Sequence, residues 1–147
     1  MALSRELDRH GFAPLGAQLA NAPELLLFLL SQPRDGAFTL EIDDHRYAQV
    51  WVHGDTEVIV VECVSNHFLP PDQALSEGAM AHLEALGFEP PSTGPRGERP
   101  NWRWEGTGVA SVLPAAERLA VALTEVLGGI PQRVAHLKVM TDAQAAA

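Results

Sequence analysis

Three apolar segments between residues 38 and 64 constrain the fold most, because only short polar stretches separate them. Residues 38–42 alternate apolar and polar side chains, residues 47–52 follow a turn at Asp43-Asp44, and residues 57–64 are rich in β-branched side chains. Alternation of this kind is typical of half-buried strands. A parallel crossover needs roughly a dozen residues or more, so these short links predict antiparallel pairing. The sequence therefore predicts a three-stranded antiparallel meander.

Apolar residues at helical spacing predict helices before and after this meander. One stretch begins near Leu3 and ends at Gly11, and a second covers about residues 15–31, with Pro14 at its first turn and Pro23 kinking or dividing it. A third helix begins at a cap on Asp72 or Ser76 and stops at Gly87. A short strand is expected over 101–105, and a long helix over about 113–127. The predicted apolar face of that last helix consists of Leu113, Ala116, Ala120, Leu123 and Leu127.

This order of elements predicts an α+β fold with an antiparallel sheet flanked by helices, in the order α-β-β-β-α-β-β-α. The chain has 147 residues, which is the size of one ordinary domain. We expect a single domain over residues 1–140. Residues 141–147 lack large apolar side chains and are expected to form a disordered tail.

Charge and composition exclude several classes of partner. The formal net charge is −9, which argues against binding to nucleic acid or to an anionic membrane. The longest apolar run, residues 25–30, has 6 residues against the roughly 20 that a membrane span needs, so we expect no membrane insertion. A lone cysteine, Cys63, allows no internal disulfide and suits a reducing compartment. We therefore predict a cytoplasmic protein.

Alternation divides the meander into an apolar face and a mixed face. The mixed face carries Tyr47, Trp51, Val58, Val60 and Glu62, and it is poorly suited to contact with bulk water. Two interpretations stay open: the N-terminal helix of the same chain covers this face, or a partner does. Glu62 is a carboxylate within an apolar strand. It should therefore lie at the edge of the face, pair with Arg103 or Arg46, or await a donor from a partner.

No motif in the sequence predicts catalysis. The histidines lack metal-binding spacing, Cys63 lies in an apolar strand, and the sequence has no G-x-S-x-G elbow and no phosphate-binding glycine loop. We predict no catalytic residue, no metal site and no cofactor, and hence a binding protein rather than an enzyme. An enzyme would need a pocket in which Glu62, His67 and Arg103 converge.

Several short motifs, taken in order, resemble a known family. They are the strand-borne run over 60–66 followed by Phe68-Leu69, the helix end over 83–88, Asn101-Trp102, and the run over 123–128 before Pro131. This arrangement, over about residues 36–134, is similar to the actinobacterial TY-Chap domains, which are related to type III secretion chaperones and to YbjN. Phe88 stands where that family often has tryptophan.

The resemblance implies a secretion-chaperone-like α+β fold that binds a peptide or a partner protein without turnover. Related chaperones are small, acidic and commonly dimeric, so a homodimer is expected. On this interpretation a segment of a client protein lies on the mixed face. Tyr47 and Trp51 supply apolar contact, Val58 and Val60 form the floor, and Glu62 supplies a charged contact. The alternative is a structural or regulatory homodimeric interaction protein without chaperone activity.

Overall fold

The computed structural model describes residues 10–92 and 98–141. It has a six-stranded antiparallel sheet in the order β1-β6-β2-β3-β4-β5. The helices are α2 (Leu15–Leu30), α3 (Glu77–Ala85) and α4 (Val112–Val121). The strands are β1 (His10–Pro14), β2 (Gly36–Glu41), β3 (Tyr47–His53), β4 (Val58–Cys63), β5 (Trp102–Thr107) and β6 (Val134–Thr141). This is the α+β fold that the sequence predicts.

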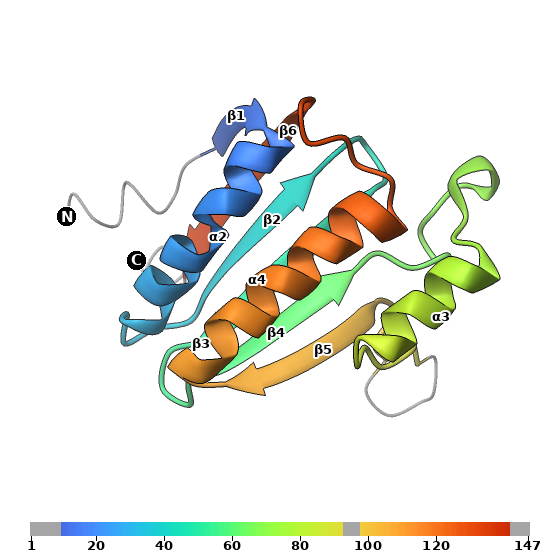
Figure 1. Ribbon diagram of the computed structural model, residues 1–147. Helices are drawn as coiled ribbons and strands as arrows, with labels where there is room; N and C mark the ends of the chain where they lie inside the picture. Colours follow the sequence, from blue (N-terminus) through green and yellow to red (C-terminus); the bar gives the residue numbers. More distant parts are fainter. Residues whose placement is uncertain (1–9, 93–97, 142–147) are drawn as a thin grey trace.

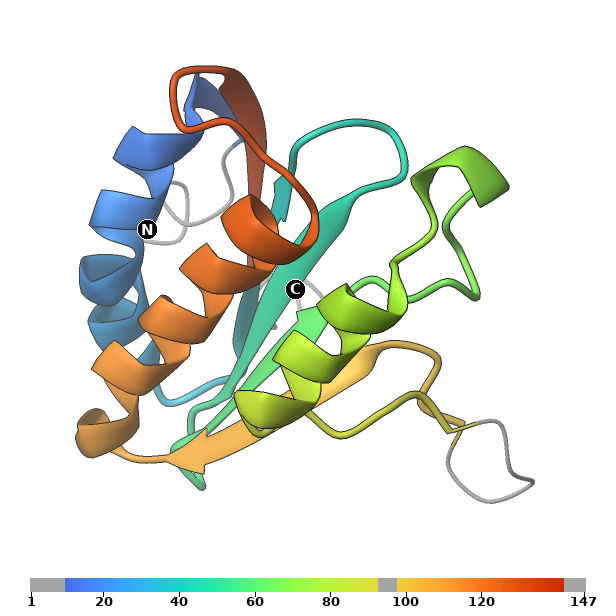
Figure 2. The same cartoon turned by 45° about the vertical axis from the view of Figure 1, so that its right-hand side comes forward.

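The three helices lie on one side of the sheet, as both views show (Figure 1, Figure 2). Beneath them the strands present Phe38, Val50 and Val61, which are paired in register across β2, β3 and β4 and are at most 1% exposed. Directly paired residues of neighbouring antiparallel strands point to the same face, so this row marks the helix-covered face. The core therefore forms between the helix layer and the apolar face of the meander.

The predicted meander is confirmed as β2, β3 and β4. Its first turn is built on Asp43, whose Oδ1 accepts hydrogen bonds from the backbone N–H groups of His45 and Arg46 at 3.0 and 2.7 Å. The Arg46 side chain donates to Asp43 Oδ2 at 2.7 Å and to the carbonyl oxygen of Leu127 at 2.7 Å. Partial burial raises the pKa of Asp43, but these hydrogen bonds and the Arg46 charge outweigh it, so the pKa lies below its ordinary value.

The N-terminal region differs from the prediction. The helix expected over about 15–31 is confirmed as α2, and Pro23 lies within it without dividing it. His10, which we place at the end of an earlier helix, instead begins β1, which pairs with β6. Residues 1–9, which hold the rest of that expected helix, lie outside the described residues. Strand β1 has five residues, and its sequence, with Gly11 and Pro14, carries no alternation that could identify it.

Helix α3 begins and ends where the sequence predicts. Ser76 is its N-cap, and the Ser76 hydroxyl accepts a hydrogen bond from the Ala79 N–H at 3.0 Å. Beyond its C-terminus, Gly87 has a φ of +93°, a conformation that glycine adopts without strain.

The buried stripe of α4 is shifted from the predicted one. The buried residues are Val112, Ala115 and Leu119, and Leu113, which we expect to be buried, is 70% exposed. Both stripes have helical spacing in this alanine-rich segment, so spacing alone does not select between them. A π-helical turn, Ala122–Val126, then continues the helix and buries Leu123.

Strand β6 follows the last helix and lies between β1 and β2 in the sheet. The sequence prediction has no strand at this place. β6 extends to Thr141, one residue beyond the predicted boundary of the domain, and residues 142–147 lie outside the described part of the chain. The observed order thus has a strand before the first helix and a strand after the last one.

Candidate functional site

The side of the sheet opposite the helices, here called the helix-free face, carries every residue that we predict for peptide binding. Helix α2 packs against α4 on the other side, so it does not cover this face (Figure 2). Within residues 10–92 and 98–141 no helix covers it. The helix over 15–31 therefore does not cover the mixed face, because the apolar stripe of α2 is buried against the opposite side of the sheet. Residues 1–9, which hold most of the other helix expected near the N-terminus, lie outside the described residues.

A row of apolar side chains crosses the middle of the helix-free face. Ala37 on β2 pairs with Met140 on β6 and with Trp51 on β3, and Trp51 pairs with Val60 on β4. We call these four residues the apolar row. Met140 and Trp51 are 52% and 38% exposed, whereas Ala37 and Val60 beside them are both 3% exposed. The row thus presents a thioether and an indole over a closed apolar floor.

A polar row runs beside the apolar row. It consists of Lys138, Thr39, Gln49, Glu62 and Arg103, paired in register from β6 to β5. Glu62 Oε1 accepts a hydrogen bond from Gln49 Nε2 at 2.8 Å and another from Trp51 Nε1 at 3.0 Å. Two donors from the neighbouring strand therefore fix the carboxylate beside the exposed indole.

Neither arginine that we consider as a partner for Glu62 forms an ion pair with it. Arg46 is bound to Asp43, within the turn before β3. Arg103 is the direct cross-strand neighbour of Glu62, but its nearest carboxylate oxygen in an ion pair is Oε2 of Glu105, at 3.9 Å. Glu62 is half-buried, and in the described part of the chain its carboxylate is held by neutral donors.

The other predicted residues lie at the ends of this surface. Val58 is half-buried and pairs with His53 and Thr107 at one end of β4. Tyr47 lies at the start of β3, where its hydroxyl oxygen accepts a hydrogen bond from Asn101 Nδ2 at 3.3 Å. Tyr47 is thereby tied to the buried Asn101, in addition to any apolar contact that it offers.

Sequence reasoning missed the part of the surface that β1 and β6 contribute. Met140 completes the apolar row, and Phe12 is 73% exposed and stacks on the His136 ring with 4.3 Å between centroids. The signal for β6 is the alternation of Ala135, Leu137 and Val139 with polar or exposed residues.

At the outer edge of β5, most backbone groups of the strand already form hydrogen bonds. Glu89 N–H donates to the Arg103 carbonyl oxygen at 2.7 Å, and Arg103 N–H donates to that of Glu89 at 3.1 Å. Farther along, the Ser111 hydroxyl accepts from Thr107 N–H at 2.9 Å and donates to the Thr107 carbonyl oxygen at 3.0 Å. A peptide that added to β5 as a further strand would have to displace these hydrogen bonds. Recognition through side chains on the helix-free face is therefore favoured over strand addition at this edge.

Comparison with known proteins identifies the family of the chain. Residues 13–145 match the family TY-Chap3, described as T3SS (YopN, CesT) and YbjN peptide-binding chaperone 3. The match includes all of the apolar row and the polar row. The chain belongs to the TY-Chap3 family. No curated protein and no solved structure matches it. Membership in TY-Chap3 places the chain in a chaperone class, as the resemblance of its motifs implies.

The one thiol of this TY-Chap3 chain is buried on the helix-covered face. Cys63 is 0% exposed, and desolvation by burial raises the pKa of its thiol from an ordinary value of 9.0 to about 12. A nucleophilic thiol needs a lowered pKa and access to substrate. His67 lies in the exposed loop after β4 with its ring edge-on to Phe68, and in the described residues no hydrogen bond or ion pair joins it to Glu62 or Arg103.

Two kinds of feature are absent from the described residues. No helix among them is both long enough and apolar enough to span a membrane. Within the same residues, no group of three or more His, Cys, Asp or Glu side chains is placed so that it could hold a metal ion.

The raised pKa predicts slow labelling of Cys63 in the native protein. At pH 8 the thiolate fraction should be about a thousandfold smaller than for an unshifted thiol, and burial blocks the reagent as well. We expect a disulfide reagent such as DTNB to react only after denaturation. Because the folded pKa is raised, the contribution of this thiol to stability is complete below about pH 9 and is lost as the pH rises toward 12.

The matched control is Thr56→Cys in a Cys63→Ala background, because Thr56 is exposed in the turn between β3 and β4. This variant should react completely in the native state. Rapid labelling of Cys63 in the native wild-type protein would contradict the buried position of the thiol.

Proposed function

We propose that the protein is a non-catalytic binding protein that holds a segment of a client protein on its helix-free face. The observation that carries this proposal is the apolar row, in which an exposed indole lies beside the fixed carboxylate of Glu62. Membership in a family of peptide-binding chaperones supports it. The predicted binding residues are Tyr47, Trp51, Val58, Val60 and Glu62, and we add Met140 to this proposal because it completes the apolar row.

The apolar contact comes chiefly from Trp51 and Met140. Trp51 offers a large rigid surface that loses little conformational entropy on binding, and tryptophan is enriched among the residues that dominate binding energies. Met140 has a flexible thioether that adapts to different side chains. Val60 and Ala37 are buried beneath these two, so they act as the floor and support the indole.

Charge favours a basic client segment. On the β4–β5 half of the helix-free face the two carboxylates of Glu62 and Glu105 outnumber the one cation, Arg103. The whole chain has a formal charge of −9. Glu62 Oε1 is used by Gln49 and Trp51, which leaves Oε2 to accept from a lysine or arginine of the client. The indole next to it adds a cation–π contact.

The binding role does not require turnover. The buried, poorly ionised Cys63 is unsuited to nucleophilic attack, and the polar row forms a ladder of cross-strand pairs on an open sheet. We therefore propose that the protein acts without catalysis and without a cofactor. The cytoplasmic location and the actinobacterial source stay predictions.

A homodimer is the second candidate. Phe12, Val134 and Met140 are all more than half exposed on β1 and β6, at one end of the sheet. Burial of these side chains against a second copy would give a structural or regulatory interaction protein in place of a chaperone. Sedimentation at several concentrations separates the two candidates, because self-association through this surface would depend on concentration and on Met140.

The test is the binding of extended peptides in which apolar residues alternate with lysine or arginine. We expect Trp51→Ala to weaken binding by about tenfold or more, because it removes the largest exposed contact. Glu62→Gln should reduce the preference for basic over neutral peptides while binding of the neutral ones persists. Fluorescence anisotropy with labelled peptides measures both effects.

Leu113→Gln provides the matched control, since Leu113 is also a large exposed apolar residue but lies on α4, on the opposite side of the molecule. Its peptide binding should equal that of the wild type. Unchanged binding by Trp51→Ala would remove the helix-free face from the proposed function.

A further inference from the structure

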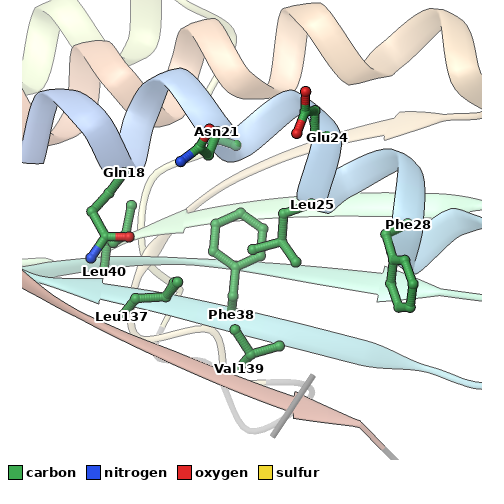
Figure 3. Close-up of a pocket in the computed structure, with 10 residues that line it drawn as sticks. Gln18, Asn21, Glu24, Leu25, Phe28, Phe38, Leu40, Leu137 and Val139 are labelled. Carbon is green, nitrogen blue, oxygen red and sulfur yellow. The ribbon is translucent and has the colours of Figure 1, made fainter. Parts of the chain in front are cut away.

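A second apolar concavity lies on the other side of the sheet, between α2 and the strands β2 and β6 (Figure 3). We call it the α2 pocket. Its volume is about 350 Å³, at the lower end of the range for ligand sites. It is lined by Gln18, Asn21, Ala22, Glu24, Leu25, Phe28, Phe38, Leu40, Leu137 and Val139.

The α2 pocket has an apolar interior and a polar rim. Leu25 and Phe28 point from α2 toward the sheet, and Phe38 and Val139 point from the strands toward the helix (Figure 3). Phe38 is buried as the floor, whereas Leu25, Phe28 and Leu137 are half-buried, so the pocket opens to the surface. Apolar side chains of another molecule can therefore enter between α2 and β6.

We propose that the α2 pocket binds the apolar face of a basic amphipathic helix of a client protein. This inference goes beyond the function proposed above, since it concerns the opposite side of the sheet and a different conformation of the bound segment. It is carried by two features of the described pocket: its floor, in which the strands are already paired with one another, and the negative charge at its rim.

The floor of the α2 pocket offers no main-chain partner. Strand β2 is paired on one side with β3 and on the other with β6. Strand β6 is paired with β2 over residues 136–141 and with β1 over residues 134–138, so beneath Leu40 and Leu137 both sides of each strand are already paired. The Gln18 amide at the rim already donates to the carbonyl oxygen of Ala135 at 3.3 Å. An extended segment wedged between α2 and these strands would be shielded from water by both, unlike a segment on the open helix-free face, so its own peptide groups would stay unpaired.

A helix avoids this cost because its backbone hydrogen bonds are internal. It would lie alongside α2, in the same layer as α2 and α4, and insert a few large apolar side chains between α2 and β6 (Figure 1). On the helix-covered side of β1 and β6 the residues nearest the edge, Gly11, Ala13 and Ala135, are small. Small side chains at these positions let a helix approach the sheet closely.

The negative charge at the rim of the α2 pocket favours basic residues on the bound helix. Among the described residues that line the pocket, Glu24 alone is charged, and it is exposed at the rim. With the net charge of −9 on the chain, this favours lysine or arginine beside the apolar stripe of the bound helix. The expected ligand is thus a helix with leucine-like residues on one face and basic residues along its border.

The experiment uses the full chain and a labelled peptide of about 14 residues with leucines at helical spacing and flanking lysines. We expect this peptide to bind and to gain helical circular dichroism on binding. Leu25→Gln and Leu137→Gln, from two different elements, should each weaken binding roughly tenfold. Glu24→Gln should weaken it by roughly two- to fivefold at low salt, since the charge lies at the rim.

Matched controls make the outcomes decisive. Leu113→Gln should bind as the wild type does, and a peptide with proline at its centre should bind far more weakly. Thermal unfolding identifies any variant that loses its fold. If one of Leu25→Gln and Leu137→Gln does so, the other still tests the pocket. Trp51→Ala should leave helix binding unchanged, so failure of this inference and failure of the proposed function are distinguishable.

Four results would overturn the inference: no binding of the helical peptide to the wild type, equal binding of the proline peptide, equal losses in Leu113→Gln and Leu25→Gln, or loss of binding in Trp51→Ala. A concentration-dependent dimer that Leu137→Gln converts to a monomer would assign the α2 pocket to a second copy instead.

Discussion

Leu26→Ala is expected to lower the free energy of unfolding by about 2–5 kcal/mol. Leu26 is 0% exposed in the buried stripe of α2, the helix that packs against α4 and the sheet. Truncation removes the transfer energy of the leucine side chain and leaves a cavity that rigid neighbours on two layers fill only in part. Urea unfolding followed by circular dichroism measures the loss as a lower midpoint.

Leu27→Ala is the matched control, because Leu27 is the next residue of the same helix and is 45% exposed, against 0% for Leu26. Both variants make the same chemical change and keep the same helix propensity. The control should cost less than about 1 kcal/mol, since little apolar surface returns to water. Equal losses in the two variants would contradict the packing of α2 described above.

Gly54→Ala is expected to destabilise the protein by about 3 kcal/mol. A Cβ at Gly54 would lie 2.5 Å from the carbonyl oxygen of Gln32 and 2.7 Å from that of Arg34. Both obstacles are backbone atoms, so the turn before β2 must move. That movement also strains the hydrogen bond from Gly54 N–H to Asp35 Oδ1, now 3.1 Å long.

Gly78→Ala tests the same substitution where there is room. The nearest atom to a Cβ at Gly78 is the Ser76 Oγ at 3.8 Å, and the residue lies in the first turn of α3. Alanine is favoured over glycine in helices by up to about 1 kcal/mol, so this variant should be neutral or more stable. Thermal unfolding of both variants under the same conditions measures the difference. A midpoint of Gly54→Ala equal to that of the wild type would contradict the predicted clash.

The meander was predictable because its information is local. Alternation in residues 38–42 and 47–52 and the short turns between them specify both the strands and their faces. Ser76 and Gly87 likewise mark the limits of α3 through local capping chemistry. Each of these features depends on residues close together in the chain.

The missed elements depend on distant partners. Strand β1 gains its hydrogen bonds from β6, more than 100 residues later in the chain, and its own sequence carries no alternation. The buried stripe of α4 is selected by what packs on it, since Val112 and Leu113 are equally apolar and only one faces the core. Such choices are made by tertiary contacts rather than by periodicity.

The candidate site was predictable to the same extent as its strands. The shared face of Trp51, Val60 and Glu62 follows from alternation, and the register confirms it. Met140 and the α2 pocket both require β6, which the sequence does not predict, so one of the four residues of the apolar row and the closure of the α2 pocket were beyond sequence-based prediction.

The position of β6 between β1 and β2 has a consequence for synthesis. A ribosome makes β1, β2 and all three helices before it reaches Val134–Thr141. Until that strand emerges, β1 has no partner and β2 exposes one edge, so the nascent sheet stays open in its interior. Long-range closure of this kind is slow and leaves edges open to mispairing. The open edges of β1 and β2 thus persist until nearly all of the described chain has been translated.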